Sequence, residues 1–321
     1  MSVKKKGAEL QKIQNLIDNA HELLEFELLE TVNYEEKEYP IWSMSIGSKR
    51  DNVPVFGLFG GVHGLERVGS QVILSWFRSL NERLHWDVEL QKSFENIRIV
   101  SIPIVNPYGV YHLKRSNGNG VDLMRNSPVE AKGTTMPLVG GHRISRYIPW
   151  YRGRAGSDME IESQVLIKYC KDQFFNSPFA MTIDFHSGFG LKDRLWYPFA
   201  KSNEEFPKIS YIKNMEKLFN NSLPYHIYTI EPQSNHYTTH GDLWDYIYEE
   251  FESQKSSNTF IPWTLEMGSW IWLKKNPWQI FSSQGLFNPM KRHRYERTMR
   301  RHYALIDYFS ALSSNYKSWV I

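Results

Sequence analysis

Short apolar runs alternate with longer amphipathic segments along most of this chain. Four runs, VPVFGLFGG, NIRIVSIPIVN, FAMTIDFHSG and FIPWTLEMG, have the length and composition of buried β-strands. Helical periodicity lies between them, in RVGSQVILSWFRSLNERL and near residues 160–175 and 212–221. This alternation predicts an α/β fold with a mixed, mainly parallel central sheet and helices on both faces.

Both ends of the chain carry helical patterns as well. Apolar residues recur every three or four positions from Leu10 to Leu28, which predicts an N-terminal helix over about residues 8–29. A basic amphipathic helix is expected over about residues 289–312, and YPIWSMSIGS is expected to be a further strand. The chain has 321 residues, 41% of them hydrophobic, and no linker-like segment, so we expect a single domain over 1–321.

Polar residues stand where the predicted strands end. His63, Asn106, His186 and Glu266 each follow or close one of the four apolar runs. In sheets of this kind, ligands bind beyond the carboxyl ends of the strands. The four side chains are therefore expected to converge on one edge of the sheet.

The pair His63 and Glu66 has the spacing of a metal site. Histidine and glutamate three residues apart, after glycines that allow a sharp turn, can both face one ion. The motif alone is weak, because His293 and Glu296 share the spacing within a helix whose charges coat its solvated face. His186 is the expected third ligand. Asp184 is an alternative ligand, or a residue that orients His186.

Composition narrows the classes of function. The net charge of +3, from 38 basic and 35 acidic residues, is too balanced to imply a nucleic-acid or membrane partner. The single cysteine, Cys170, lies in an amphipathic pattern and is expected to be a buried thiol. Without a signal peptide or a membrane-spanning run, we expect a cytoplasmic protein. The sequence gives no indication of oligomeric state.

The motifs GGVHGLE, GVDLMRN, DFHSG and TLEMG, in this order, resemble those of the carboxypeptidase A–like zinc carboxypeptidases. NPYGV, YRGRAGSDMEIES and YTTHGDLWDYIY resemble further stretches of that family. The resemblance runs from about Ile41 to Gly268 and implies the metallocarboxypeptidase fold. It also implies a peptide or peptide-like substrate with a free carboxylate, from which the C-terminal residue is cleaved.

The resemblance assigns a role to each matching position. His63, Glu66 and His186 match the ligands of one Zn²⁺ ion, and Glu266 matches the catalytic glutamate. Zinc lowers the pKa of a bound water to near 7, so that the water can lose a proton and attack as hydroxide. A carboxylate must accept this proton and pass it to the leaving nitrogen, which suits Glu266.

Three more residues match groups that contact the substrate. Arg125 matches the arginine that binds the terminal carboxylate, which suits a planar bidentate donor. Arg115 matches the arginine that polarises the scissile carbonyl, and Tyr237 matches the tyrosine that closes over the substrate.

The sequence departs from the family pattern at Met124, where the family usually has an asparagine that helps the arginine. Methionine cannot donate a hydrogen bond, so Asn126 is a candidate replacement. Asp242 and Trp244 follow Tyr237 where relatives line the side-chain pocket, and an aspartate there would favour a cationic side chain. The alternative is that Asp242 caps the segment LWDYIY.

Other functions stay open at this stage. A zinc amidohydrolase of the succinylglutamate desuccinylase or aspartoacylase type would share the ligands, the arginine and the glutamate, but would cleave N-acyl amino acids. A catalytically silent binding module could keep the same fold, and Met124 slightly favours it, whereas Glu266 and three intact ligands oppose it. A nucleic-acid protein that uses the basic C-terminal helix is the weakest alternative.

Overall fold

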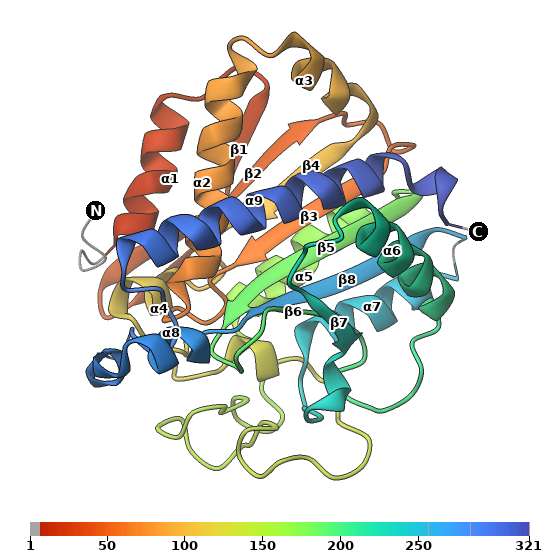
Figure 1. The fold of residues 1–321 in the computed structure, drawn as a ribbon. Coiled ribbons are helices and arrows are strands. Elements are labelled where there is room, and N and C mark those ends of the chain that lie inside the picture. Colours follow the sequence, from red (N-terminus) through yellow and green to blue (C-terminus); the bar gives the residue numbers. More distant parts are fainter. Residues whose placement is uncertain (1–6, 256, 283, 321) are drawn as a thin grey trace.

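The computed structural model describes residues 7–255, 257–282 and 284–320. Within these residues the sheet consists of β1 (Leu24–Tyr34), β2 (Lys37–Gly47), β3 (Val55–Gly60), β4 (Arg98–Ile102), β5 (Phe179–Ser187), β6 (Arg194–Tyr197), β7 (Thr229–Pro232) and β8 (Thr259–Met267). The eight strands lie in the order β1-β2-β4-β3-β5-β8-β6-β7 (Figure 1). The central strands β4, β3, β5 and β8 are parallel, and the antiparallel pairs lie on either side. This confirms the predicted mixed, mainly parallel sheet.

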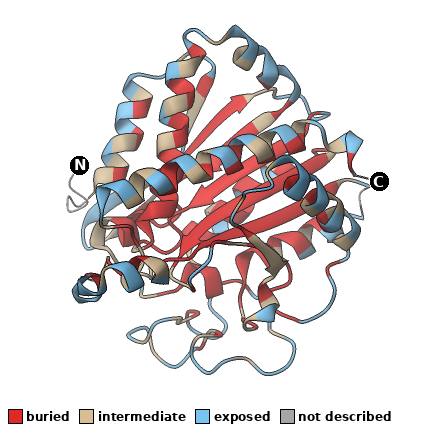
Figure 2. Ribbon diagram, in the orientation of Figure 1, coloured by how far each residue is buried: buried red, intermediate tan, exposed pale blue. Residues whose placement is uncertain are grey.

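Helices cover both faces of the sheet. The helices of the described residues are α1 (Ala8–Asp18), α2 (Arg67–Leu84), α3 (Val88–Ser93), α4 (Pro107–His112), α5 (Ile161–Phe174), α6 (Ile209–Ser222), α7 (Leu243–Ser253), α8 (Trp270–Lys275) and α9 (Arg292–Ser314), of which α3 and α8 lie beyond the ends of the sheet (Figure 1). Helices α2 and α9 pack on β3 and β5 from one side, and α5 and α7 lie behind the sheet (Figure 1). Buried residues concentrate in the central strands between these layers (Figure 2).

Strands β5 and β8 are buried along their whole length. A parallel strand covered on both faces has continuous apolar sequence, as FAMTI and TFIPW show. The ionisable residues of these strands, Asp184, His186 and Glu266, lie toward the carboxyl ends, and the register places His186 directly beside Glu266. The fold therefore brings two of the predicted site residues together through main-chain pairing alone.

The predicted N-terminal helix over 8–29 is wrong beyond Asp18. Helix α1 ends there, and residues 24–34 form β1, which pairs antiparallel with β2. In the segment LEFELLETVNY apolar and polar residues also alternate, as in a strand, so the sequence fits both a helix and a strand. Pairing with β2 selects the strand. The hairpin turn at Glu35 and Glu36 gave no sequence signal, because both residues have positive φ where Asn or Gly is usual.

Most other predicted elements are confirmed. Helix α2 has the predicted bounds, while α5, α6 and α9 overlap the other predicted helices within a few residues. The edge strand β7, its neighbour β6 and helix α7 were not predicted. Strands β6 and β7 have four residues each, too few to show a period.

Candidate active site

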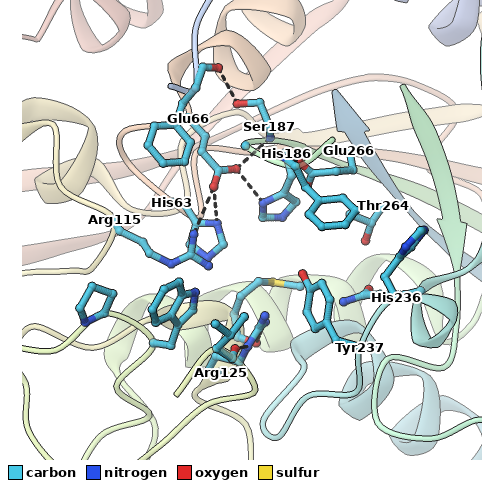
Figure 3. Close-up of a pocket in the computed structure, with 18 of the residues that line it drawn as sticks. His63, Glu66, Arg115, Arg125, His186, Ser187, His236, Tyr237, Thr264 and Glu266 are labelled. Carbon is cyan, nitrogen blue, oxygen red and sulfur yellow. Dashed lines mark hydrogen bonds and ion pairs between the residues drawn. The ribbon is translucent and has the colours of Figure 1, made fainter. Parts of the chain in front are cut away.

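Three predicted metal ligands meet at the carboxyl ends of β3 and β5. His63 follows β3, Glu66 precedes α2, and His186 lies near the end of β5. Their ligand atoms all lie within 4.8 Å of one another (Figure 3). The turn depends on Gly64, where an added Cβ would lie 1.9 Å from the main chain of Gly109. The local sequence therefore lets β3 turn into α2 with His63 and Glu66 on the same side.

Each histidine turns one ring nitrogen toward Glu66 and the other toward an aspartate. His63 Nδ1 lies 2.9 Å from Glu66 Oε1, and its Nε2 lies 3.0 Å from Asp122 Oδ1. His186 Nδ1 lies 3.1 Å from Glu66 Oε2, and its Nε2 lies 2.8 Å from Asp184 Oδ2. A carboxylate on the far nitrogen fixes the ring orientation and makes the near nitrogen a better metal ligand.

The charges of this cluster are strongly coupled. Burial alone would raise the pKa of Glu66, but His63 and His186 hold that pKa well below its usual range. Burial likewise opposes a charged His186, yet Asp184 and Glu66 raise its pKa well above the ordinary value. Despite its burial, Asp122 has its pKa lowered by Arg115 and His63. The site thus holds buried carboxylates that favour a cation between the two rings.

The donor set fits zinc. Two imidazole nitrogens and one carboxylate are the three protein ligands of many catalytic zinc sites, which keep a further position open. All three side chains are buried, and the far nitrogen of each histidine is already held by a carboxylate. His63, Glu66 and His186 could therefore hold one metal ion.

A cavity of about 660 Å³ opens beside the three ligands. The predicted residues Arg115, Arg125, Tyr237 and Glu266 line it, together with Met124. Arg115 approaches from one side, Tyr237 from the other, and Arg125 from the wall opposite Glu66 (Figure 3). Its remaining lining includes Leu65, Met136, Val139, Pro149, Trp150, Phe189, Trp196, Gln233, His236, Thr264 and Phe287.

Glu266 lies at the end of β8, in the wall of the cavity. Its Oε1 accepts a hydrogen bond of 2.9 Å from the main-chain N–H of Phe189. Burial and the nearby charge of Glu66 raise the pKa of Glu266 to about 8. A carboxyl with a raised pKa holds and releases protons near neutral pH, as a general acid or base must.

The two arginines differ in their partners. Arg115 Nε donates to Asp122 at 2.7 Å, and its Nη1 lies 3.4 Å from Glu66. Arg125 is buried, and its guanidinium donates to the main-chain carbonyls of Met124 and Val139. Among the described residues, no carboxylate lies within ion-pair distance of Arg125. This side chain is a buried cation that faces the cavity, and its charge interacts with Asp122 and Asp242 only beyond ion-pair distance.

Three predicted substrate-binding residues lie elsewhere. Asp242 caps α7, where its carboxylate accepts from the N–H groups of Trp244 and Asp245. Trp244 donates its indole N–H to Asp184 at 2.9 Å, and Asn126 uses its amide on the main chain of Arg152 and Glu160. None of the three lines the cavity. The pocket roles predicted for Asp242 and Trp244, and the replacement role of Asn126, are therefore wrong.

Asn106 and the second histidine–glutamate pair also stay outside the cavity. Asn106 caps α4 and donates to the carbonyl of Val62, so it supports the turn that carries His63. His293 is exposed on α9, and Glu296 pairs with Arg292, as expected of a solvated helix face.

Sequence reasoning missed Asp122. This aspartate contacts both His63 and Arg115, and so connects a ligand to a cavity arginine. It belongs to the motif DLMRN, three residues before Arg125, and also caps the short 3₁₀ helix η2 (Leu123–Arg125). The aspartate at the start of that motif was the available signal.

Comparison with known proteins agrees with this geometry. A zinc carboxypeptidase family model matches residues 32–270, well over half of the chain. The chain belongs to the zinc carboxypeptidase family. Carboxypeptidase SOL1 from Arabidopsis thaliana is 32% identical over 93 residues, which are 28% of this chain and 19% of that protein. The chain therefore matches only a small part of that relative's length.

Solved structures share the fold at low sequence identity. Thrombin activatable fibrinolysis inhibitor superposes with a TM-score of 0.67 at 15% identity, covering 94% of this chain and 72% of that one. Carboxypeptidase A from Helicoverpa armigera gives 0.58 at 17% identity, with 92% and 71% covered. A metallo-carboxypeptidase from Pseudomonas aeruginosa gives 0.54 at 13% identity, with 94% and 69% covered.

The ligand assignment predicts the behaviour of His186→Ala. We expect the purified protein to bind about one equivalent of zinc and this variant to lose most of it, because a catalytic zinc site has three protein ligands. Metal analysis after dialysis measures the content. His293→Ala, in the exposed pair of the same spacing, is the control and should keep its zinc. Full retention by His186→Ala would contradict the assignment.

Trp244 should tune the metal affinity through Asp184. Trp244→Phe replaces the indole with a smaller aromatic ring that lacks the N–H, so the hydrogen bond to Asp184 is lost. Outer partners of this kind typically contribute roughly 10–100-fold in affinity. Competition with a chromogenic chelator measures the dissociation constant. Trp263→Phe is the matched control, because Trp263 is also buried and its indole nitrogen has no hydrogen-bond partner among the described residues. An equal loss in both variants would indicate packing as the cause.

Proposed function

We propose that this protein is a zinc-dependent carboxypeptidase that hydrolyses the C-terminal amide bond of a peptide. The observation that carries the proposal is the buried Arg125, which forms no direct ion pair with a described residue and shares one cavity with the ligand cluster and Glu266. A zinc ion held by His63, Glu66 and His186 would supply Lewis acidity and lower the pKa of water to near 7. The remaining steps use side chains of the chain itself.

Glu266 is the proposed general base and acid. Its carboxyl faces the cavity, and its Oε1 is oriented by the N–H of Phe189. It takes the proton of the attacking water and delivers it to the leaving nitrogen. Burial supports this role, because a buried carboxyl changes its protonation state near neutral pH more readily than an exposed one.

The arginines and the tyrosine are proposed to position the substrate. Arg125 pairs with the terminal carboxylate in a bidentate geometry that suits a guanidinium. Arg115, held rigid by Asp122, directs its charge to the oxygen of the scissile carbonyl, where negative charge develops. Tyr237 stands on the opposite wall, and its phenol closes the cavity over the substrate (Figure 3).

The cavity favours a neutral side chain at the cleaved residue. The acidic residues in its lining are Glu66 and Glu266, and both already have proposed roles. Around Thr264 the wall is formed by neutral and aromatic groups, among them Trp196, Phe189 and Gln233. This replaces the cationic preference that Asp242 implied, because the carboxylate of Asp242 is used to cap α7.

Glu266→Gln should separate binding from chemistry. The amide keeps the shape but cannot carry the proton, so we expect normal zinc content and a kcat lowered by roughly 10²–10⁴ or more. Steady-state hydrolysis of a short peptide by zinc-loaded enzyme measures the loss. Near wild-type turnover would mean that another group is the base. Loss of zinc would show that Glu266 supports the ligands.

The free carboxylate is tested with a matched pair of peptides. Amidation of the C-terminus removes the partner of Arg125, and we expect kcat/KM to fall by about 2–5 kcal/mol of transition-state binding. Equal hydrolysis of acid and amide would contradict a carboxypeptidase. An N-acyl amino acid in the same panel tests the amidohydrolase alternative. Preference for it over every peptide would assign the site to that class.

A further inference from the structure

The segment between β8 and α9 projects from the body of the molecule. Helix α8 is followed by a short 3₁₀ helix, η4 (Pro277–Phe281), which extends beyond the sheet and its covering helices (Figure 1). The side chains of Trp278, Ile280 and Phe281 are 79%, 58% and 82% exposed. Trp278 and Phe281 lie side by side, with ring centroids 6.0 Å apart. Apolar side chains gathered in this way on a surface indicate a site of interaction.

The exposure of these side chains is fixed by the turn itself. Gln279, in their midst, is buried and donates its amide to the carbonyls of Gly285 at 2.7 Å and Asn288 at 3.2 Å. An added Cβ at Gly285 would lie 1.9 Å from the carbonyl oxygen of Gln279, so the close approach requires glycine. These hydrogen bonds hold the side chain of Gln279 in the interior, and the side chains of Trp278 and Ile280 on either side of it point to the solvent.

The same region is strongly basic although the chain as a whole is nearly neutral. Residues 268–295 contain five lysines and arginines and no aspartate or glutamate. Arg294 donates hydrogen bonds to the carbonyls of Trp272 and Lys275, and these bonds connect the start of α9 to α8. Lys274, Lys275 and Lys291 are exposed there, and none of them forms an ion pair within the described part of the chain.

We propose that Trp278, Ile280, Phe281, Lys274, Lys275 and Lys291 form a basic aromatic surface that binds an anionic lipid bilayer. Tryptophan and phenylalanine insert at the boundary between headgroups and acyl chains, while lysines reach the lipid phosphates. The charge complementarity favours an anionic membrane over an apolar protein partner. Within the described residues no helix could cross a bilayer, so the contact would be peripheral.

The expectation of no membrane partner rested on the total charge, which conceals this local excess. Helix α8, which carries Lys274 and Lys275 of this surface, begins beside the cavity. The indole N–H of Trp270 donates to the carbonyl of Gly188 at 2.8 Å, and its ring packs 5.6 Å from the ring of Phe189, a cavity residue. Binding through the surface would thus hold the cavity close to the bilayer. The proposal does not depend on the proposed function.

Co-sedimentation of the full chain with lipid vesicles tests the proposal. We expect binding to phosphatidylcholine vesicles that contain phosphatidylglycerol, little binding to pure phosphatidylcholine, and weakening by added salt. Trp278→Ala/Phe281→Ala should weaken the binding roughly tenfold or more, because both inserted rings are lost. Lys274→Glu/Lys275→Glu should weaken it too, through the lost charge. Far-UV circular dichroism and zinc content check that each variant is folded.

Trp86→Ala is the matched control, because Trp86 is 71% exposed near α3 and should not contribute. The proposal is overturned if the wild-type protein does not bind the anionic vesicles, or if Trp86→Ala weakens binding as much as the double variant. It is also overturned if binding is equal on neutral vesicles. Light scattering addresses the alternative of a second copy. A dimer that dissociates in Trp278→Ala/Phe281→Ala would make this surface an interface between chains.

Discussion

The carboxylate of Glu66 is the group on which the arrangement of the site depends. It faces His63 and His186, accepts a hydrogen bond from the N–H of Ser187, and lies 3.4 Å from Arg115. These partners come from the end of β3, the end of β5 and the loop after α4. A buried charge that loses its partners costs several kcal/mol. Moving any one of these segments would remove a partner of Glu66, so the interactions of Glu66 hold the three segments in place.

The charges around Glu66 do not balance within the protein. Glu66, Asp122 and Asp184 are buried carboxylates, and Arg115 is the arginine that contacts two of them. Protonation of His186 relieves part of this excess, as its raised pKa reflects. A divalent cation would relieve more of it, because it replaces the proton and interacts with Glu66 directly. The electrostatic arrangement therefore favours metal binding independently of the family resemblance.

The parts of the site predicted correctly from the sequence were those set by local rules. His63, His186 and Glu266 end apolar strands, and the carboxyl ends of neighbouring parallel strands must lie together. The errors arose where a side chain had two possible partners. Asp242 and Trp244 were assigned to the cavity, but a helix cap and a hydrogen bond to Asp184 use them. The contact of Trp244 joins residues 60 positions apart, which no local pattern records. The cap at Asp242 is local, and the sequence offered it beside the cavity role without deciding between the two.

The departure at Met124 has a physical meaning in the structure. Its side chain lines the cavity beside Arg125, whose guanidinium is buried among main-chain carbonyls. A neutral hydrogen-bond donor at this position would add a hydrogen bond to a bound carboxylate beside those from Arg125. It would not change the net charge of the site. With methionine there, the proposed recognition of a carboxylate rests on the charge of Arg125, because this buried cation forms no direct ion pair with a described residue. A bound anionic group would therefore stabilise this buried charge, which supports the proposed binding of a terminal carboxylate at Arg125.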